Sequence, residues 1–252
     1  DIADQTGLPV DTNFQIMSAK ESDNFNYTAL EYTYGALLDD DEGGGDPSVQ
    51  PVLISVEEYN VDLLTRFETL YPAPSASTKA LFVVEGGNKV GSTSTAASIT
   101  TGSWPTGATV TLRLNSGSYI VGKGGDEGEA GGLALSLQND LTLVNNGIIG
   151  GGGGGGGQVV VGASYRAGGG GGAGFSIGLS GDSFYSGGVD DYAENGTTET
   201  GGSGGLINTG GEINLRANGG AGGDLAEDGT DGTGDGTVYS GGVAGRAIDH
   251  NG

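Results

Sequence analysis

Alternation of apolar and polar residues in the first half of the chain predicts β-strands. Two short alternating stretches, residues 14–16 and 25–29, are separated by polar residues, which is typical of a β-hairpin. Residues 81–84 form a compact apolar run closed by two glycines, and apolar positions alternate over 110–114, so both segments are predicted strands. Residues 52–64 fit either a strand or a short helix. The pattern as a whole predicts a mainly β protein with little α-helix.

The sequence has two parts that differ strongly in glycine content. Of the 56 glycines, 11 fall in residues 1–117 and 45 in residues 118–252. The second part contains an unbroken run at 150–157 and another at 168–172, the latter followed by Ala173 and Gly174. All 6 prolines lie in the first part and the glycines follow no strict triplet period, so a collagen helix is excluded.

The glycine runs are compatible with either a flexible linker or an ordered bundle. A free glycine chain in water is disordered, because glycine loses much backbone entropy on folding and has no side chain to bury. However, the β-branched apolar segments 141–144 and 158–161 flank the first run, and linkers rarely carry such surface. In a bundle of polyglycine helices of the polyproline II (PPII) type, backbones can hydrogen-bond on all sides only where no Cβ separates them. We therefore predict a glycine-rich bundle with 150–157 as a buried central rod.

Composition and charge exclude several classes of function. Without cysteine the chain has no disulfides or thiolate metal sites, and His250 is its single histidine, so neither a zinc site nor a Ser-His-Asp triad is expected. A net charge of -23 with 9 basic residues disfavours nucleic acid as a partner. No catalytic residues, metal or cofactor are predicted. Because Asp1 replaces an initiator Met, we expect the sequence to be the distal part of a longer protein.

Composition also indicates domain boundaries. Residues 39–47 are acidic and punctuated by glycine, which is typical of a solvated linker. We predict a β region at 1–42, a linker and connecting segment at 43–78, a small β-rich region at 79–117 and the glycine-rich domain at 118–252. Trp104 is expected to anchor a core at the domain junction rather than to stack on a ligand.

Residues near the start resemble a known viral family. Asn13–Glu21 and Asn26–Tyr32 resemble the last hairpin of the hub region in lambda-type phage tail-tip attachment proteins. This resemblance covers residues 13–38. It implies a protein at the tail tip of a virion, with other tail-tip or hub proteins as partners and assembly as a homotrimer.

The glycine-rich part resembles a second phage element. Gly117–Gly122, Leu143–Ile149 with its glycine run, and Gly245–Ile248 are similar to the glycine-rich C-terminal domain of phage tail-tip and tail-fibre proteins. That domain resembles the T-even tail-fibre adhesins, whose glycine rods form a lattice and whose loops contact the bacterial receptor. The resemblance covers most of 117–252 and implies host attachment through a receptor on the bacterial outer surface, either protein or glycan.

Candidate contact residues are expected in the segments that join the rods, because binding residues are commonly carried on loops of a rigid scaffold. We take 162–167, 182–199 and 224–240 as these loops. Their aromatic, arginine and aspartate side chains are typical of binding surfaces. The predicted receptor-binding residues are Tyr165, Arg166, Phe184, Tyr185, Asp190, Asp191, Tyr192 and Tyr239. The aromatic residues among them equally fit a role in capping the bundle or packing on a neighbouring subunit.

Two acidic clusters, Asp126–Glu129 and Asp224–Asp235, have the oxygen ligands that Ca²⁺ prefers, but we expect solvated charge instead. The favoured function is receptor binding by a phage tail-tip protein. The alternatives are a structural glycine-rich spacer or surface-layer protein, and a polysaccharide depolymerase that would release sugar from the host envelope.

Overall fold

A computed structural model of the chain describes residues 48–185, 191–208 and 216–250. The chain divides into two compact units, Asp1–Pro51 and Val52–Gly252, and the second unit is described below. The predicted hairpin at 14–29 lies outside the described residues.

The first part of the unit is a three-sided β-solenoid. Each coil of the chain contributes one strand to each of three sheets, and strands from successive coils pair in parallel. One sheet contains β1 (Val49–Ile54), β4 (Lys79–Val84), β7 (Thr109–Leu114) and β10 (Thr142–Asn145). The second contains β2 (Glu58–Tyr59), β5 (Lys89–Gly91), β8 (Tyr119–Val121) and β11 (Ile148–Gly150). The third contains β3 (Val61–Asp62), β6 (Ile99–Thr100), β9 (Leu135–Leu137) and β19 (Ile248–His250).

The solenoid encloses the apolar residues that the sequence pattern identified. Five consecutive residues of β4, from Ala80 to Val84, are buried, and β7 buries alternate residues of its sequence. The strands predicted at 81–84 and 110–114 are therefore confirmed. Trp104 packs edge-on against Phe67 and Phe82, and its Nε1 donates to the carbonyl of Thr101 at 2.7 Å, which confirms it as a core anchor.

The ambiguous segment 52–64 contains both kinds of structure. It supplies the end of β1, then β2 and β3, and finally the start of helix α4 (Leu63–Glu68). Asp62 caps this helix, since its carboxylate accepts a hydrogen bond from the Thr65 amide at 2.7 Å. Leu63 and Phe67 bury the inner face of the helix against the solenoid core. No helix in the described part of the chain is long and apolar enough to cross a membrane.

The helix cap at Asp62 should contribute to the free energy of unfolding in a pH-dependent way. Burial alone would raise the pKa of Asp62, but hydrogen bonds from Thr65 and the Thr100 hydroxyl outweigh it and hold the pKa below 3.8, its ordinary value. The carboxylate therefore stabilises the fold above that pH, and this contribution disappears as the pH falls through the folded-state pKa. We expect Asp62→Ala to lower the free energy of unfolding by about 1 kcal/mol at pH 7. Urea unfolding at pH 7 and at pH 2.5 measures this, and an equal loss at both pH values would contradict it.

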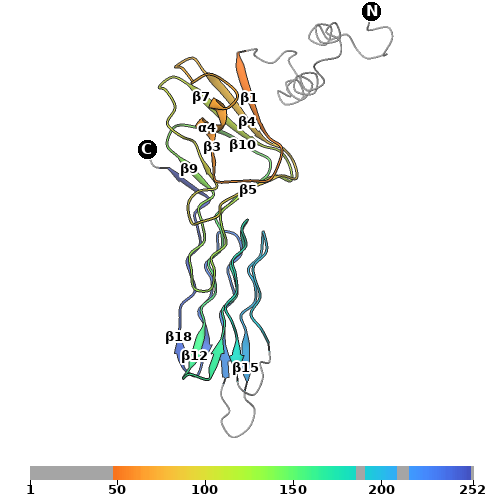
Figure 1. Ribbon diagram of the computed structural model, residues 1–252, viewed down its shortest axis with the longest axis vertical. Coiled ribbons are helices and arrows are strands. Elements are labelled where there is room, and N and C mark those ends of the chain that lie inside the picture. The colour runs from red at the N-terminus through yellow and green to blue at the C-terminus, as the bar shows by residue number, and fades with distance from the viewer. Residues whose placement is uncertain (1–47, 186–190, 209–215, 251–252) are drawn as a thin grey trace, which may run out of the picture. The chain divides into compact units, whose positions relative to one another are not determined.

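The glycine rods are insertions into the solenoid. After β8 the chain leaves the solenoid at Gly122 and returns to form β9, and after β11 it leaves again and returns only at β19. The second return is in register, because Ile248 pairs with Leu135 of β9. Figure 1 shows the rods running side by side from the solenoid to the end that carries β12, β15 and β18. The predicted segments 43–78, 79–117 and 118–252 thus share one solenoid, since β1, β4, β7 and β10 lie in one sheet.

The central rod, Gly150–Gly157, is buried along its whole length, as the sequence predicted. Its amides donate to three neighbouring segments and its carbonyls accept from three, at 2.7–3.0 Å, with no hydrogen bond inside the rod. The acceptor segments are 129–132, 168–174 and 227–230, and the donor segments are 122–128, 219–226 and 242–245. Six backbones therefore surround one, and they pair with the amides of 152–157 and with every carbonyl of the rod.

The rod repeats every three residues. The amides of Gly152 and Gly155 donate to the same neighbour, 129–132, and those of Gly153 and Gly156 both donate to 168–174. A Cβ built on Gly155 would lie 1.8 Å from the carbonyl oxygen of Asp126. Three residues per turn without internal hydrogen bonds is the PPII geometry, and the closeness of its neighbours explains the requirement for glycine.

The second glycine run behaves in the same way. Residues 168–174 are buried and lie among the central rod, 219–223 and four further segments: 125–127, 176–181, 194–197 and 202–205. A Cβ on Gly172 would lie 2.1 Å from the carbonyl oxygen of Gly153. The two longest glycine runs are thus the two rods with backbone neighbours on all sides, which confirms the predicted relation between burial and glycine.

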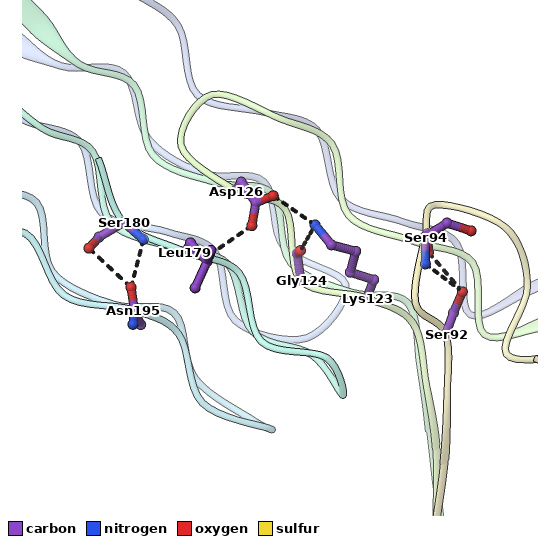
Figure 2. A network of polar contacts seen from close by, with 8 residues as sticks. All are labelled: Ser92, Ser94, Lys123, Gly124, Asp126, Leu179, Ser180 and Asn195. Atoms are coloured by element: carbon purple, nitrogen blue, oxygen red, sulfur yellow. Dashed lines mark hydrogen bonds and ion pairs between the residues drawn. The ribbon is translucent and has the colours of Figure 1, made fainter. Parts of the chain in front are cut away.

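At the edges of the set of packed rods, which we call the lattice, side-chain oxygens replace main-chain acceptors. The Asp126 carboxylate accepts the Leu179 amide at 2.8 Å and binds the Lys123 ammonium at 3.0 Å, and Asn195 Oδ1 accepts the Ser180 amide at 2.8 Å (Figure 2). Asp224 and Asp228 accept amides of other rods in the same way. These aspartates are exposed or partly exposed, and they also accept hydrogen bonds from the rods. No group of three or more possible metal-ligating side chains occurs within the described ranges.

Aromatic residues join the rods to the solenoid. The ring of Phe175, in the turn between two rods, stacks on Tyr59 of β2 with centroids 4.9 Å apart, and Lys89 of β5 lies over the same ring. Nearby, the Tyr119 hydroxyl donates to Glu199 at 2.7 Å, and this hydrogen bond to a carboxylate raises the pKa of Tyr119. These contacts fix the first turns of the rods against one sheet.

Candidate functional site

The rods end in two small antiparallel sheets, which we call the tip. One sheet has the order β14 (Phe184–Tyr185), β13 (Tyr165–Ala167), β12 (Val159–Val161), β18 (Thr237–Val238). The other has the order β15 (Leu206–Asn208), β16 (Arg216–Asn218), β17 (Thr233–Gly234).

A small apolar core joins the two sheets of the tip. Val159 and Ala167 of the first sheet pack with Ile207 and Ala217 of the second, and all four are fully buried. The change from glycine to alternating valine, alanine and isoleucine marks the point at which the rods become strands. The tip is thus a separate packed layer at the end of the lattice.

Several predicted contact residues lie together on the first sheet. Tyr165 and Arg166 belong to β13 and are opposite Tyr185 and Phe184 of β14, respectively. The side chain of Phe184 is 44% exposed, whereas those of Tyr165 and Arg166 are partly buried. The sheet therefore brings together four residues from two predicted loops.

The other predicted residues flank this sheet. Tyr239 directly follows β18, is 47% exposed and donates its amide to the carbonyl of Gln158 at 3.0 Å. Asp191 forms an isolated bridge with Leu206 of the second sheet, and its neighbour Tyr192 is 64% exposed. Asp190 lies outside the described residues.

Comparison with known proteins gives the family. The sequence profile described as "Phage tail fibre adhesin Gp38" matches residues 51–252, which includes the solenoid, the rods and the tip. The chain belongs to this family. The adhesin also has the fold of a chain in the crystal structure of the gp37-gp38 adhesin tip complex of the bacteriophage S16 long tail fiber, with a TM-score of 0.51 and 24% identity over 80% of this chain and 75% of that one. No curated protein sequence matches it. The resemblance of residues 13–38 to lambda-type proteins lies outside both the described and the matched residues and stays a prediction.

Two of the loops predicted from the sequence are only partly loops. Within 182–199, residues 194–197 form a rod beside 168–174, and within 224–240, residues 227–230 form a rod beside the central one. The turns near Thr197 and Asp224 lie at the solenoid end of the rods. The tip of the adhesin receives only the parts of these segments near Phe184, Tyr192 and Val238.

The structure adds two exposed apolar residues to the site. Leu206 on β15 is 39% exposed and Val238 on β18 is 44% exposed. Sequence reasoning missed both, although Val238 precedes Tyr239 in a Thr- and Gly-rich segment that the sequence marks as a turn region. Together with Phe184, Tyr192 and Tyr239, they make five exposed apolar or aromatic side chains on the tip. Exposed aromatic and apolar side chains of this kind are typical of binding surfaces.

Arg166 differs from the other predicted contact residues. Its guanidinium forms an ion pair with Glu127, which belongs to the turn between two rods, and the Nε atom of Arg166 is enclosed by protein. The side chains of Arg166 and Glu127 are 27% and 14% exposed, respectively. The side chain of Arg166 is thus bound to a partner in the rods.

Proposed function

We propose that this adhesin attaches a phage particle to its bacterial host through the tip. The observation that carries the proposal is the position of five exposed apolar and aromatic side chains at the end of the rods: Phe184, Tyr192, Leu206, Val238 and Tyr239. Aromatic side chains supply large contact areas at small entropic cost and are common at the centres of protein interfaces. The membership of the Gp38 adhesin family supports the same function.

The rods suit this function because they are rigid and independent of the tip sequence. Their hydrogen bonds are made by backbone atoms and by side chains at the lattice edges, so the residues at the tip are free to match a receptor. Both a protein and a glycan of the bacterial outer surface remain candidate receptors. We further propose that the solenoid attaches the adhesin to a tail-fibre subunit, since the similar S16 structure is a complex of gp37 with gp38.

Two finer points from the sequence remain proposals. Residues 13–38 would connect the adhesin to a tail-tip hub of the lambda type, and the assembled protein would be a homotrimer. In the described part of one chain the two buried rods, 150–157 and 168–174, find all their neighbours within that same chain. Any trimer would therefore form outside the interior of the lattice.

Substitution of exposed tip residues tests the function. We expect the combined variant Phe184→Ser, Tyr192→Ser and Tyr239→Ser to lower the affinity of the purified adhesin for host cells by at least about a hundredfold, because each removes a contact of hot-spot size. The unfolding free energy should change by less than about 1 kcal/mol, because the three side chains are largely exposed. Binding is measured with fluorescently labelled protein on intact host cells.

The control places the same change elsewhere on the surface. Val243 is 61% exposed on the flank of the rods, so Val243→Ser removes apolar surface without altering the tip. This variant should bind as the parent does. Unchanged host binding by the triple variant would favour the spacer interpretation.

A further inference from the structure

Glu127 lies where one rod ends. The segment 122–128 runs along the central rod and reverses in a turn closed by a hydrogen bond from the Glu129 amide to the Asp126 carbonyl at 2.8 Å. The chain then returns toward the solenoid as 129–132. Rod 168–174, in contrast, extends past this turn to β13, which precedes it in the sequence. The amides at the β13 end of this rod therefore need acceptors that segment 122–128 no longer supplies.

The side chain of Glu127 takes the place of the missing carbonyl. The Gly172 amide donates to the carbonyl of Gly125 at 2.8 Å, and one turn nearer the tip the Gly169 amide donates to Glu127 Oε1 at 2.7 Å. Gly181 leaves the room that the carboxylate occupies, because a Cβ there would lie 1.9 Å from Glu127 Oε1. The carboxylate therefore extends the three-residue pattern of acceptors by one position.

The second oxygen of the same carboxylate holds the tip. Glu127 Oε2 accepts a hydrogen bond from Arg166 Nη2, and Arg166 is the central residue of β13. In register, Arg166 is opposite Val160 of β12 and Phe184 of β14. A largely buried charge pair is strongly directional, and removing one partner leaves the other unsatisfied. One carboxylate thus connects a lattice amide to the strand at the middle of the tip sheet.

We propose that Glu127 and Arg166 are positioning residues for host recognition, and that Arg166 does not itself contact the receptor. The pair fixes β13 on the rods and thereby holds the exposed Phe184 of the adjoining strand in its binding orientation. This inference rests on the proposed attachment function. It replaces the interpretation of Arg166 as a receptor anchor, which the sequence suggested from its place among aromatic residues.

The two roles predict different behaviour of a double-mutant cycle. If the pair positions the tip, breaking it from either side has the same consequence, and a second substitution adds nothing. If Arg166 contacts the receptor, removing Glu127 frees the guanidinium and leaves binding intact or stronger, whereas removing Arg166 weakens it.

The experiment measures the affinity of the purified full chain for intact cells of the bacterium on which the phage grows, for Glu127→Gln, Arg166→Gln and the double variant. We expect each single variant to weaken binding about tenfold and the double variant to be no weaker than either single one. Glutamine at 127 keeps an oxygen for the Gly169 amide, so the lattice should persist. Normal binding by Glu127→Gln together with weak binding by Arg166→Gln, or additive losses, would overturn the proposal.

Three further measurements separate the possible causes of a loss. Arg246→Gln breaks the exposed ion pair with Asp249 on the solenoid and should leave binding unchanged. Amide hydrogen exchange should become faster in β12, β13 and β14 of the single variants while remaining slow in the central rod. If a glutamine variant does not fold, Glu127→Asp provides the test, with weaker binding expected because the shorter carboxylate cannot reach both the Gly169 amide and Arg166. Failure of the parent protein to bind host cells would instead contradict the proposed function itself.

Discussion

Gly155→Ala should prevent the adhesin from forming a stable lattice. The added methyl group would lie 1.8 Å from the carbonyl oxygen of Asp126, a backbone atom that cannot rotate away. Because the rod has hydrogen-bonded neighbours on all sides, it cannot move to relieve the clash without breaking bonds to another segment. We expect a loss of more than about 4 kcal/mol in the free energy of unfolding, which is large for a single added carbon.

Adjacent residues in a neighbouring rod provide the matched control. A Cβ on Gly222 would lie 2.1 Å from the carbonyl oxygen of Gly171, whereas Ala221 already carries a side chain and is exposed. Gly222→Ala should therefore be strongly destabilising and Ala221→Ser nearly neutral. Thermal unfolding followed by circular dichroism measures all three variants. A cooperative transition for Gly155→Ala at the parent temperature would show that the rods are not packed as described.

Deletion of a single glycine from 150–157 should be at least as damaging as the substitution. Each residue of the rod faces a neighbour set by its position in the three-residue repeat, so removing one turns the remainder by a third of a revolution. Gln158 would then occupy the position of Gly157, where a Cβ meets the carbonyl oxygen of Tyr239 at 1.9 Å. We expect the product to be insoluble or unfolded.

The control deletion lies in the tip. Ala163 belongs to the exposed turn between β12 and β13. Its deletion should leave a soluble protein with a cooperative unfolding transition, because loop length is tolerated at exposed turns. Soluble expression and small-angle scattering compare the two deletions. If both deletion variants were soluble and folded, the residues of the central rod would not be fixed to particular neighbours.

Local sequence patterns revealed those parts of the fold that depend on local physics. The apolar runs at 81–84 and 110–114 predicted strands because burial of alternate or consecutive residues is visible within a few positions. The length of the run at 150–157 predicted a surrounded rod because only glycine fits where backbones touch on every side. Neither inference required knowledge of what lies elsewhere in the chain.

The solenoid escaped prediction because its pairing joins distant residues. β9 pairs with β19, so that Leu135 meets Ile248 across the long insertion after β11, which has the composition of a separate domain. No local signal marks Gly122 or Gly151 as the points where the chain leaves one structure for another. The division at residue 118 followed composition, whereas the fold places β8 to β11 of the glycine-rich part in the solenoid.

The same distinction holds at the tip. Phe184, Tyr192 and Tyr239 were predicted from residue type and occur as exposed side chains at one end of the rods. Arg166 was given the same role, yet its partner Glu127 is 39 residues away and belongs to an acidic cluster that looked solvated. Residue type alone does not show which polar side chains are paired with other residues of the rods.

The return of the chain from the tip to β19 has a mechanical consequence. A pull on the tip of a tethered particle acts along the rods, while the hydrogen bonds between rods lie across them, so the load is shared as shear over many bonds at once. Both ends of the long insertion are fastened to the same solenoid, through β11 and β19. An adhesin built in this way should resist drag on the virion until many bonds fail together, rather than unravelling one rod at a time.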